Sequence, residues 1–285
     1  MDSSTEEKKY EFFEQIDKYI DRASKLDVSD QLEDYDRTCA FLLNEGGLRK
    51  IKSNFICEKF QYLFHLLSHS STDDRKINLT DSDYEFMNFW INHKVRNSDI
   101  NDSVVAEKFY KDLIINGENT KKDGILKQYI YYIDDNIYEH MEILYILHNN
   151  FSKIYKNEQI SCGDKDTCSM YTNECNDKYK KGIYKCSPYN KSKFCLKLED
   201  LKSKYEKIQN VKSLRYNFTL SELITLPTYY QAVKELGSVF EIWKDVIISG
   251  ISILSIILGL FLILLYFYKV NILFNQYMWA NYIYY

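Results

Sequence analysis

The sequence predicts an all-α protein: a helical bundle with a disulfide-stapled, cysteine-rich segment, followed by one transmembrane helix. Three observations lead to this fold class. The 285 residues contain only two prolines, and none precedes Pro188, so long helices can run without interruption. Apolar residues recur at helical spacing between Tyr10 and Tyr155. The stretch 246–268 then contains no charged residue, Asn, Gln or Pro.

The bundle begins with three predicted helices. Ser4 and Glu7 have the spacing of a capping box and open the first helix. Its inward face is expected to consist of Tyr10, Phe13, Ile16, Ile20 and Ala23. The second helix is expected over 31–45 and the third over 54–67. The polar run 69–78 after them is typical of an exposed loop.

A fourth helix is expected to begin at Thr80 or Asp81 and to carry the central part of the core. Trp90 should face inward together with Phe86 and Met87. The polar residues of this helix are expected to occupy other angles: Asn88, Asn92 and Lys94. Aromatic residues at helical spacing are interpreted as core rather than as a ligand groove.

Later helices are expected from Asp102 or Ser103 through Leu113, and over 125–155, where the apolar periodicity is longest. Shorter helices are expected over 166–180 and 196–209. The predicted organisation is therefore a bundle at 1–159, a cysteine-rich segment at 160–209, a linker at 210–245, the transmembrane helix at 246–268 and a short tail at 269–285, uncharged after Lys269.

The length of the apolar stretch suggests the membrane helix. At a rise of 1.5 Å per residue, residues 246–268 would extend over about 35 Å, and a hydrocarbon core is about 30 Å thick. The N-terminus has no apolar segment that resembles a cleavable signal peptide. The formal net charge of −4 is spread along the chain and gives no reason to expect nucleic acid as a partner.

No catalytic, cofactor-binding or metal-binding residue is predicted, because the phosphate-binding glycine motifs, the GxSxG elbow and the kinase signatures are missing from the sequence. His65 and His69 have the i, i+4 spacing of metal ligands but lack the glutamate of the HExxH pattern. We expect them to be a solvated pair at a helix end. The sequence therefore predicts a protein that is not an enzyme.

The seven cysteines are candidates for disulfides: Cys39, Cys57, Cys162, Cys168, Cys175, Cys186 and Cys195. The last five lie in a polar window without a CxxC pair or a histidine, which favours disulfide staples over zinc. Cys39 and Cys57 lie on consecutive predicted helices and could form a bridge. The number is odd, so at least one thiol stays free or pairs outside the chain, and the pairing among the five is left open. Disulfides would place this domain in an oxidising compartment.

Several segments together resemble the Plasmodium interspersed repeat superfamily, especially the Vir-type variable proteins of vivax-like malaria parasites. They are the Cys39-Ala-Phe-Leu-Leu-Asn segment, the aromatic run from Phe86 to Val95, and the Cys175…Cys186…Cys195-x-x-Leu pattern followed by Leu201 to Tyr205. The Tyr- and Asn-rich composition agrees with it. The uncharged tail differs from the short, charged tail of that family.

The resemblance implies a variant antigen that a blood-stage parasite exports to the infected red cell or its surface. It implies a helical domain presented to the host, with immune evasion by sequence variation and contacts with host receptors and antibodies. It supplies no catalytic residues. An alternative hypothesis is an intracellular, membrane-anchored scaffold in the infected red cell, whose thiols stay free in a reducing cytosol. The state of the cysteines distinguishes the two.

Overall fold

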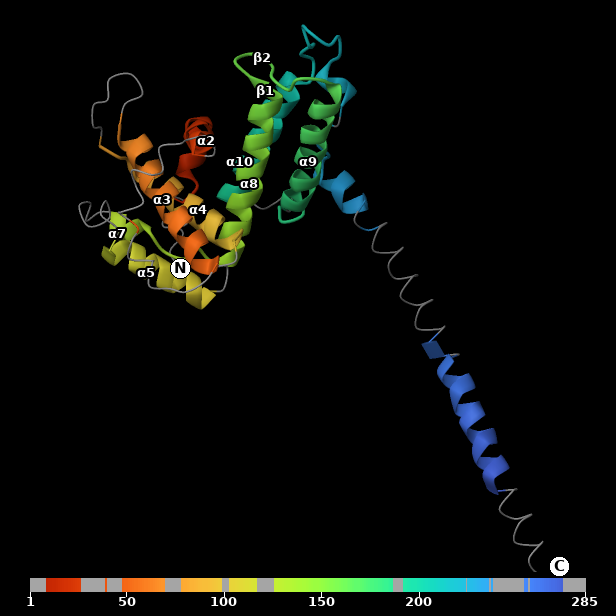
Figure 1. The fold of residues 1–285 in the computed structure, drawn as a ribbon. Coiled ribbons are helices and arrows are strands. Elements are labelled where there is room, and N and C mark those ends of the chain that lie inside the picture. Colours follow the sequence, from red (N-terminus) through yellow and green to blue (C-terminus); the bar gives the residue numbers. More distant parts are fainter. Residues whose placement is uncertain are drawn as a thin grey trace, which may run out of the picture. The chain divides into compact units, whose positions relative to one another are not determined.

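The computed structural model describes residues 9–26, 39, 48–69, 78–98, 103–116, 126–186, 192–223, 225–235, 237, 254–255 and 257–273. The described residues are mostly helical (Figure 1), so the helical part of the predicted fold class agrees with the structure. The chain divides into two compact units, Met1–Tyr229 and Tyr230–Tyr285, and the first holds the site analysed below.

The first unit consists of short and long helices with one small hairpin. In chain order these are the 3-10 helix η1 (Glu11–Gln15), α2 (Ile16–Lys25), α3 (Leu48–Ser68), α4 (Asp81–Arg96), α5 (Ser103–Asn116), α7 (Leu126–Tyr129), α8 (Asp135–Ile154), β1 (Tyr155–Lys156), β2 (Gln159–Ile160), α9 (Lys165–Ile183), α10 (Lys193–Ile208) and the 3-10 helix η3 (Leu220–Glu222). The two strands pair antiparallel.

The predicted transmembrane helix over 246–268 is wrong. In the described part of the chain, no helix has both the length and the apolar character needed to cross a membrane. The described helical run over 257–273 contains Lys269 and is shorter than the roughly 20 apolar residues that a crossing requires. Residues 246–253 and 256 lie outside the described residues.

The predicted inward face of the first helix agrees with the structure. All five residues of that face are buried: Tyr10, Phe13, Ile16, Ile20 and Ala23. The backbone begins as η1 and continues as α2 after Gln15. The predicted cap at Ser4 and Glu7 lies outside the described residues, as do most of the predicted helix 31–45 and most of the predicted loop 69–78.

Helix α4 lies at the centre of this unit and is buried at nearly every angle. Thr80 caps it, and a reciprocal capping box joins Thr80 to Asp83. The inward positions predicted for Phe86, Met87 and Trp90 are confirmed, because each side chain is at most 2% exposed.

The angles predicted for Asn88 and Asn92 are wrong, because both side chains are 0% exposed. The prediction of one helix over 125–155 is also wrong. The chain forms α7, leaves the helical conformation from Ile130 to Asp134, and enters α8. These two errors have one physical cause, since the buried amides of α4 bind the backbone of the extended segment 130–134. Main-chain groups that a helix would satisfy internally are satisfied by side chains instead.

The cysteine-rich segment belongs to the same hydrophobic core as the helices before it. Helices α9 and α10 run alongside α8 (Figure 1). Gly182 lies where the three helices meet: a Cβ atom there would come within 3.1 Å of Leu198 and 3.2 Å of Ile143. A glycine therefore permits a close approach that alanine would obstruct.

Replacing Trp90 with alanine should destabilise the protein severely. Trp90 is 2% exposed, and truncation of a buried Trp or Phe typically costs about 3–5 kcal/mol. Urea unfolding of the full chain, followed by far-ultraviolet circular dichroism, measures the change. Met170→Ala is the control, because Met170 is 55% exposed and its truncation should change stability by less than about 0.5 kcal/mol. A loss below about 1 kcal/mol for Trp90→Ala would contradict the core assignment.

Candidate functional site

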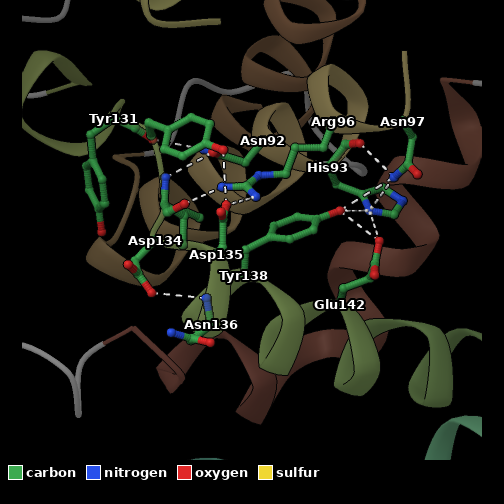
Figure 2. Close-up of polar contacts among 12 residues, drawn as sticks. Asn92, His93, Arg96, Asn97, Tyr131, Asp134, Asp135, Asn136, Tyr138 and Glu142 are labelled. Carbon is green, nitrogen blue, oxygen red and sulfur yellow. Dashed lines mark hydrogen bonds and ion pairs between the residues drawn. The ribbon is translucent and has the colours of Figure 1, made fainter. Parts of the chain in front are cut away.

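Two buried asparagines, one helical turn apart on α4, hold the extended segment 130–134. We call Asn88 and Asn92 the amide clamp. The Asn88 Oδ1 atom accepts from the Tyr131 N–H at 3.1 Å, and the Asn92 Oδ1 atom accepts from the Ile133 N–H at 3.0 Å. The Asn92 Nδ2 atom donates to the Tyr131 carbonyl at 2.9 Å (Figure 2). The amide clamp thus supplies the donors and acceptors that a neighbouring β-strand would supply.

Arg96 continues this row one turn further along α4. Its guanidinium donates to the Ile133 carbonyl and to the Asp135 carboxylate. It lies between two tyrosine rings, 4.2 Å from the centroid of Tyr132 and 4.3 Å from that of Tyr138. Hydrogen bonds from Arg96 and Tyr132 lower the pKa of Asp135. Arg96 therefore fixes the start of α8 to the end of α4.

A histidine, a tyrosine and a glutamate form a second polar cluster between α4 and α8. The Tyr138 hydroxyl donates to Glu142 Oε1 at 2.8 Å and lies 3.0 Å from His93 Nδ1 (Figure 2). His93 Nδ1 lies 3.6 Å from the same carboxylate. The nearby His93 ring and the hydrogen bond from Tyr138 lower the pKa of Glu142 to about 2, although burial opposes both. Burial and the hydrogen bond to Glu142 raise the pKa of Tyr138.

Asp83 ties the N-terminal helices to the start of α4. Its carboxylate accepts from Lys18 Nζ at 2.6 Å, from the Tyr19 hydroxyl at 3.0 Å and from the Thr80 N–H at 2.8 Å. Burial raises the pKa of Asp83, but the hydrogen bonds from Lys18 and Thr80 outweigh it and leave the pKa below its usual value. This buried carboxylate is therefore a structural anchor in its ionised form.

Glu85 differs from the other acidic groups of α4, since burial raises its pKa to about 7. The charges of Asp81 and Glu11 raise it further, and Lys9 opposes them. Burial also favours the neutral form of His148 on α8, which is a base. It lies 6.0 Å from Phe13 between ring centroids, and burial lowers its pKa to about 3. Both groups are therefore held in their neutral forms near pH 6.

Six of the seven cysteines form disulfides, which join Cys39 to Cys57, Cys162 to Cys168 and Cys186 to Cys195. Their Cα atoms are 6.0, 5.3 and 5.6 Å apart, within the range that a disulfide requires. Cys175 is the free thiol and is buried in α9. Burial raises its pKa to about 12, so this thiol is un-ionised and inert at neutral pH.

The histidines with metal-ligand spacing are half-buried rather than solvated. The His69 Nδ1 atom lies 2.9 Å from the His65 carbonyl oxygen, and the two rings lie 4.1 Å apart between centroids. One ring nitrogen is therefore engaged with the backbone. Within the described ranges, no group of three or more His, Cys, Asp or Glu side chains could hold a metal ion.

Sequence reasoning missed the role of Asn88, Asn92 and Arg96. A signal was present, because apolar residues flank Asn88 on both sides and directly precede Asn92, from Phe86 to Ile91. A helix that is apolar at all angles is buried, and buried amides need partners. Their spacing of four residues then indicates one row facing one partner.

Comparisons of the chain with protein-family models, with curated proteins and with solved structures found no match.

Replacing Asn92 with leucine, whose side chain has the same number and branching of heavy atoms, should destabilise the protein by about 2–6 kcal/mol. The change leaves the buried Ile133 N–H and Tyr131 carbonyl without their amide partner, and each unsatisfied group costs about 1–3 kcal/mol. Urea unfolding measures the loss. Asn173→Leu on the exposed face of α9 is the control. If the two variants had equal free energies of unfolding, the amide clamp would not contribute to stability.

Replacing Glu85 with glutamine should stabilise the protein above neutral pH. Between pH 4.5 and about 7 the folded state keeps a proton that the unfolded chain releases, so the carboxyl group lowers stability as pH rises through this window. The gain of Glu85→Gln over the wild type should therefore grow by up to about 1.4 kcal/mol per pH unit and level off above pH 7. Urea unfolding at a series of pH values measures it.

Glu199→Gln, at an exposed position on α10, is the control for this pH series and should show no such trend. A gain for Glu85→Gln that is the same at pH 5 and pH 8 would contradict the assignment. The wild-type curve alone is not diagnostic, because His148 acts in the opposite direction and reduces stability as pH falls below 6.5.

Proposed function

We propose that this chain is a variant antigen of a blood-stage malaria parasite, whose helical domain is exposed in an oxidising compartment and contacts host molecules there. The observation that carries the proposal is the pairing of six cysteines within one small domain. Disulfides persist in oxidising compartments and are rare in a reducing cytosol. The resemblance to the Plasmodium interspersed repeat superfamily supports the role in immune evasion and adhesion.

The positions of two disulfides support an exposed domain. Cys162–Cys168 joins the segment after β2 to the first turn of α9, and Cys186–Cys195 joins the end of α9 to the first turn of α10. Both bridges therefore fix connections between helices, and their four cysteines are buried in the core. Cross-links of this kind stabilise mainly by restricting the unfolded chain, typically by about 2–4 kcal/mol.

The use of the polar residues of α4 supports binding rather than catalysis. Asn92, Arg96, His93 and Glu142 are engaged with backbone or with one another, and each contact joins one helix to the next element. These polar side chains therefore hold the helices together inside the unit. Exposed connections can then change in sequence without altering the core, as antigenic variation requires.

Differential alkylation with N-ethylmaleimide tests the redox state that the proposal requires. The native full chain should take up no label, since its single free thiol, Cys175, is buried. The denatured chain should take up one label before reduction and seven after it. Cys175→Ser should abolish the label that appears before reduction and leave the disulfides intact. Seven labels on the denatured chain without reduction would favour the scaffold in the red-cell cytosol.

Protease treatment of intact infected red cells distinguishes display of the helical domain on the cell surface from its retention inside the cell. Loss of the helical domain from intact cells supports the antigen. Protection of that domain until the cells are lysed would exclude surface display. A known cytosolic protein, probed in the same samples, reports whether the cells stayed intact.

A further inference from the structure

A groove of about 320 Å³ lies between two turns of the chain, residues 158–163 and 211–216. The hairpin β1–β2 provides the first wall, and the turn that follows α10 provides the second. None of the residues in the two polar clusters of α4 lines it. The groove is therefore separate from the contacts that hold the helices together.

The first wall is a strand edge whose outward main-chain groups form no hydrogen bond with the residues that the structure describes. Lys156 pairs with Gln159, and the Ser161 N–H donates to the Ile154 carbonyl at 2.8 Å. In this antiparallel register Ile160 faces Tyr155 as a non-hydrogen-bonded pair, so its N–H and C=O point away from β1. Ile160 lines the groove. An extended chain could therefore continue the hairpin at this edge.

The second wall also has a residue whose main-chain groups point away from its paired residue. Lys212 pairs with Thr219 in an isolated bridge. The Ser213 N–H donates to the Phe218 carbonyl at 2.6 Å, and the Leu220 N–H donates to the Val211 carbonyl at 3.3 Å. These bonds flank the bridge and make it a non-hydrogen-bonded pair, so the N–H and C=O of Lys212 point away from Thr219. Lys212 also lines the groove.

Two exposed side chains of the second wall are cationic. Lys212 and Arg215 both line the groove, and neither forms an ion pair with a residue that the structure describes. Between them Leu214 is 93% exposed. On the first wall Glu158 adopts a φ of 63°, a left-handed conformation that favours glycine and that costs other residues about 1–2 kcal/mol. The hairpin turn therefore contains a strained backbone conformation at Glu158.

We propose that this groove binds an extended, acidic peptide segment of a partner protein. The partner's main chain would pair with the free N–H and C=O groups of Ile160 and Lys212, and its carboxylates would face Lys212 and Arg215. Main-chain pairing supplies affinity, and the two cations select for acidic sequences. This inference deepens the proposed function by naming a contact site, and it rests on that function for the partner's origin.

Fluorescence anisotropy with the oxidised full chain tests the inference. The probe is a fluorescein-labelled Thr-Val-Asp-Val-Asp-Val-Thr peptide. The same peptide with lysine in place of aspartate should bind at least tenfold more weakly, and N-methylation of alternate valine amides should abolish binding. Arg215→Glu should weaken binding of the acidic peptide at least tenfold. Lys207→Glu, at an exposed position on α10, makes the same charge reversal outside the groove and should leave binding of the acidic peptide unchanged.

Several outcomes would overturn the inference. They are failure of the acidic peptide to bind, equal binding of the acidic and basic peptides, and binding that Arg215→Glu leaves intact. Binding of a heparin hexasaccharide that depends on Arg215, without binding of the peptide, would assign the groove to an anionic glycan instead. Arg215→Ala repeats the test without charge reversal, and circular dichroism checks the fold. Peptide binding is measured in vitro, so its failure leaves the alkylation result and the proposed function untouched.

Discussion

The arrangement of the described helices depends on the amide clamp. The extended segment 130–134 is packed against α4 in a place where no strand pairs with it, and its buried main-chain groups still need partners. Asn88 and Asn92 supply them. The clamp sets where α7 stops and where Asp134 can cap α8, through its bond from the Asn136 N–H. Helices α9 and α10 lie against α8, so the cysteine-rich segment packs on the helix whose start follows the clamped segment.

The amides of the clamp contribute more to stability than the exposed ion pairs do, as their typical free energies show. An exposed pair such as Lys165–Glu222 contributes about 0–1 kcal/mol. A buried group left without its partner costs about 1–3 kcal/mol, and Asn92 alone serves two main-chain groups. The buried charge of Asp83 follows the same rule, because Lys18, Tyr19 and Thr80 surround it with donors. Glu85 has no comparable set of donors among its pKa influences, and burial raises its pKa to about 7 instead.

Periodicity predicted most of the described helices and the inward positions of Phe86, Met87 and Trp90 on α4, because helical spacing reports which face leaves water. It could not locate the break before α8, since Ile130 and Ile133 continue the helical spacing of Tyr129 although the chain leaves the helical conformation after Tyr129. That break depends on amides about 40 positions earlier in the chain, a distance that local patterns do not report. Two-residue strands such as β1 and β2 are too short to alternate visibly. Hydropathy predicted a membrane helix over 246–268, whereas no helix of the described residues is long and apolar enough to cross a membrane.

The separation between the amide clamp and the groove has a consequence for variation. The turn 213–216 is attached to the unit by its ends, where Ser213 pairs with Phe218 and Val211 with Leu220 through the main chain. Main-chain pairing constrains side chains little, so Leu214, Arg215 and Tyr216 can change without disturbing a buried contact. The Cys162–Cys168 disulfide holds the opposite wall, and this covalent bond does not depend on the side chains of neighbouring residues. A site built this way can alter what it recognises while the core stays constant, which a variant antigen under immune pressure requires.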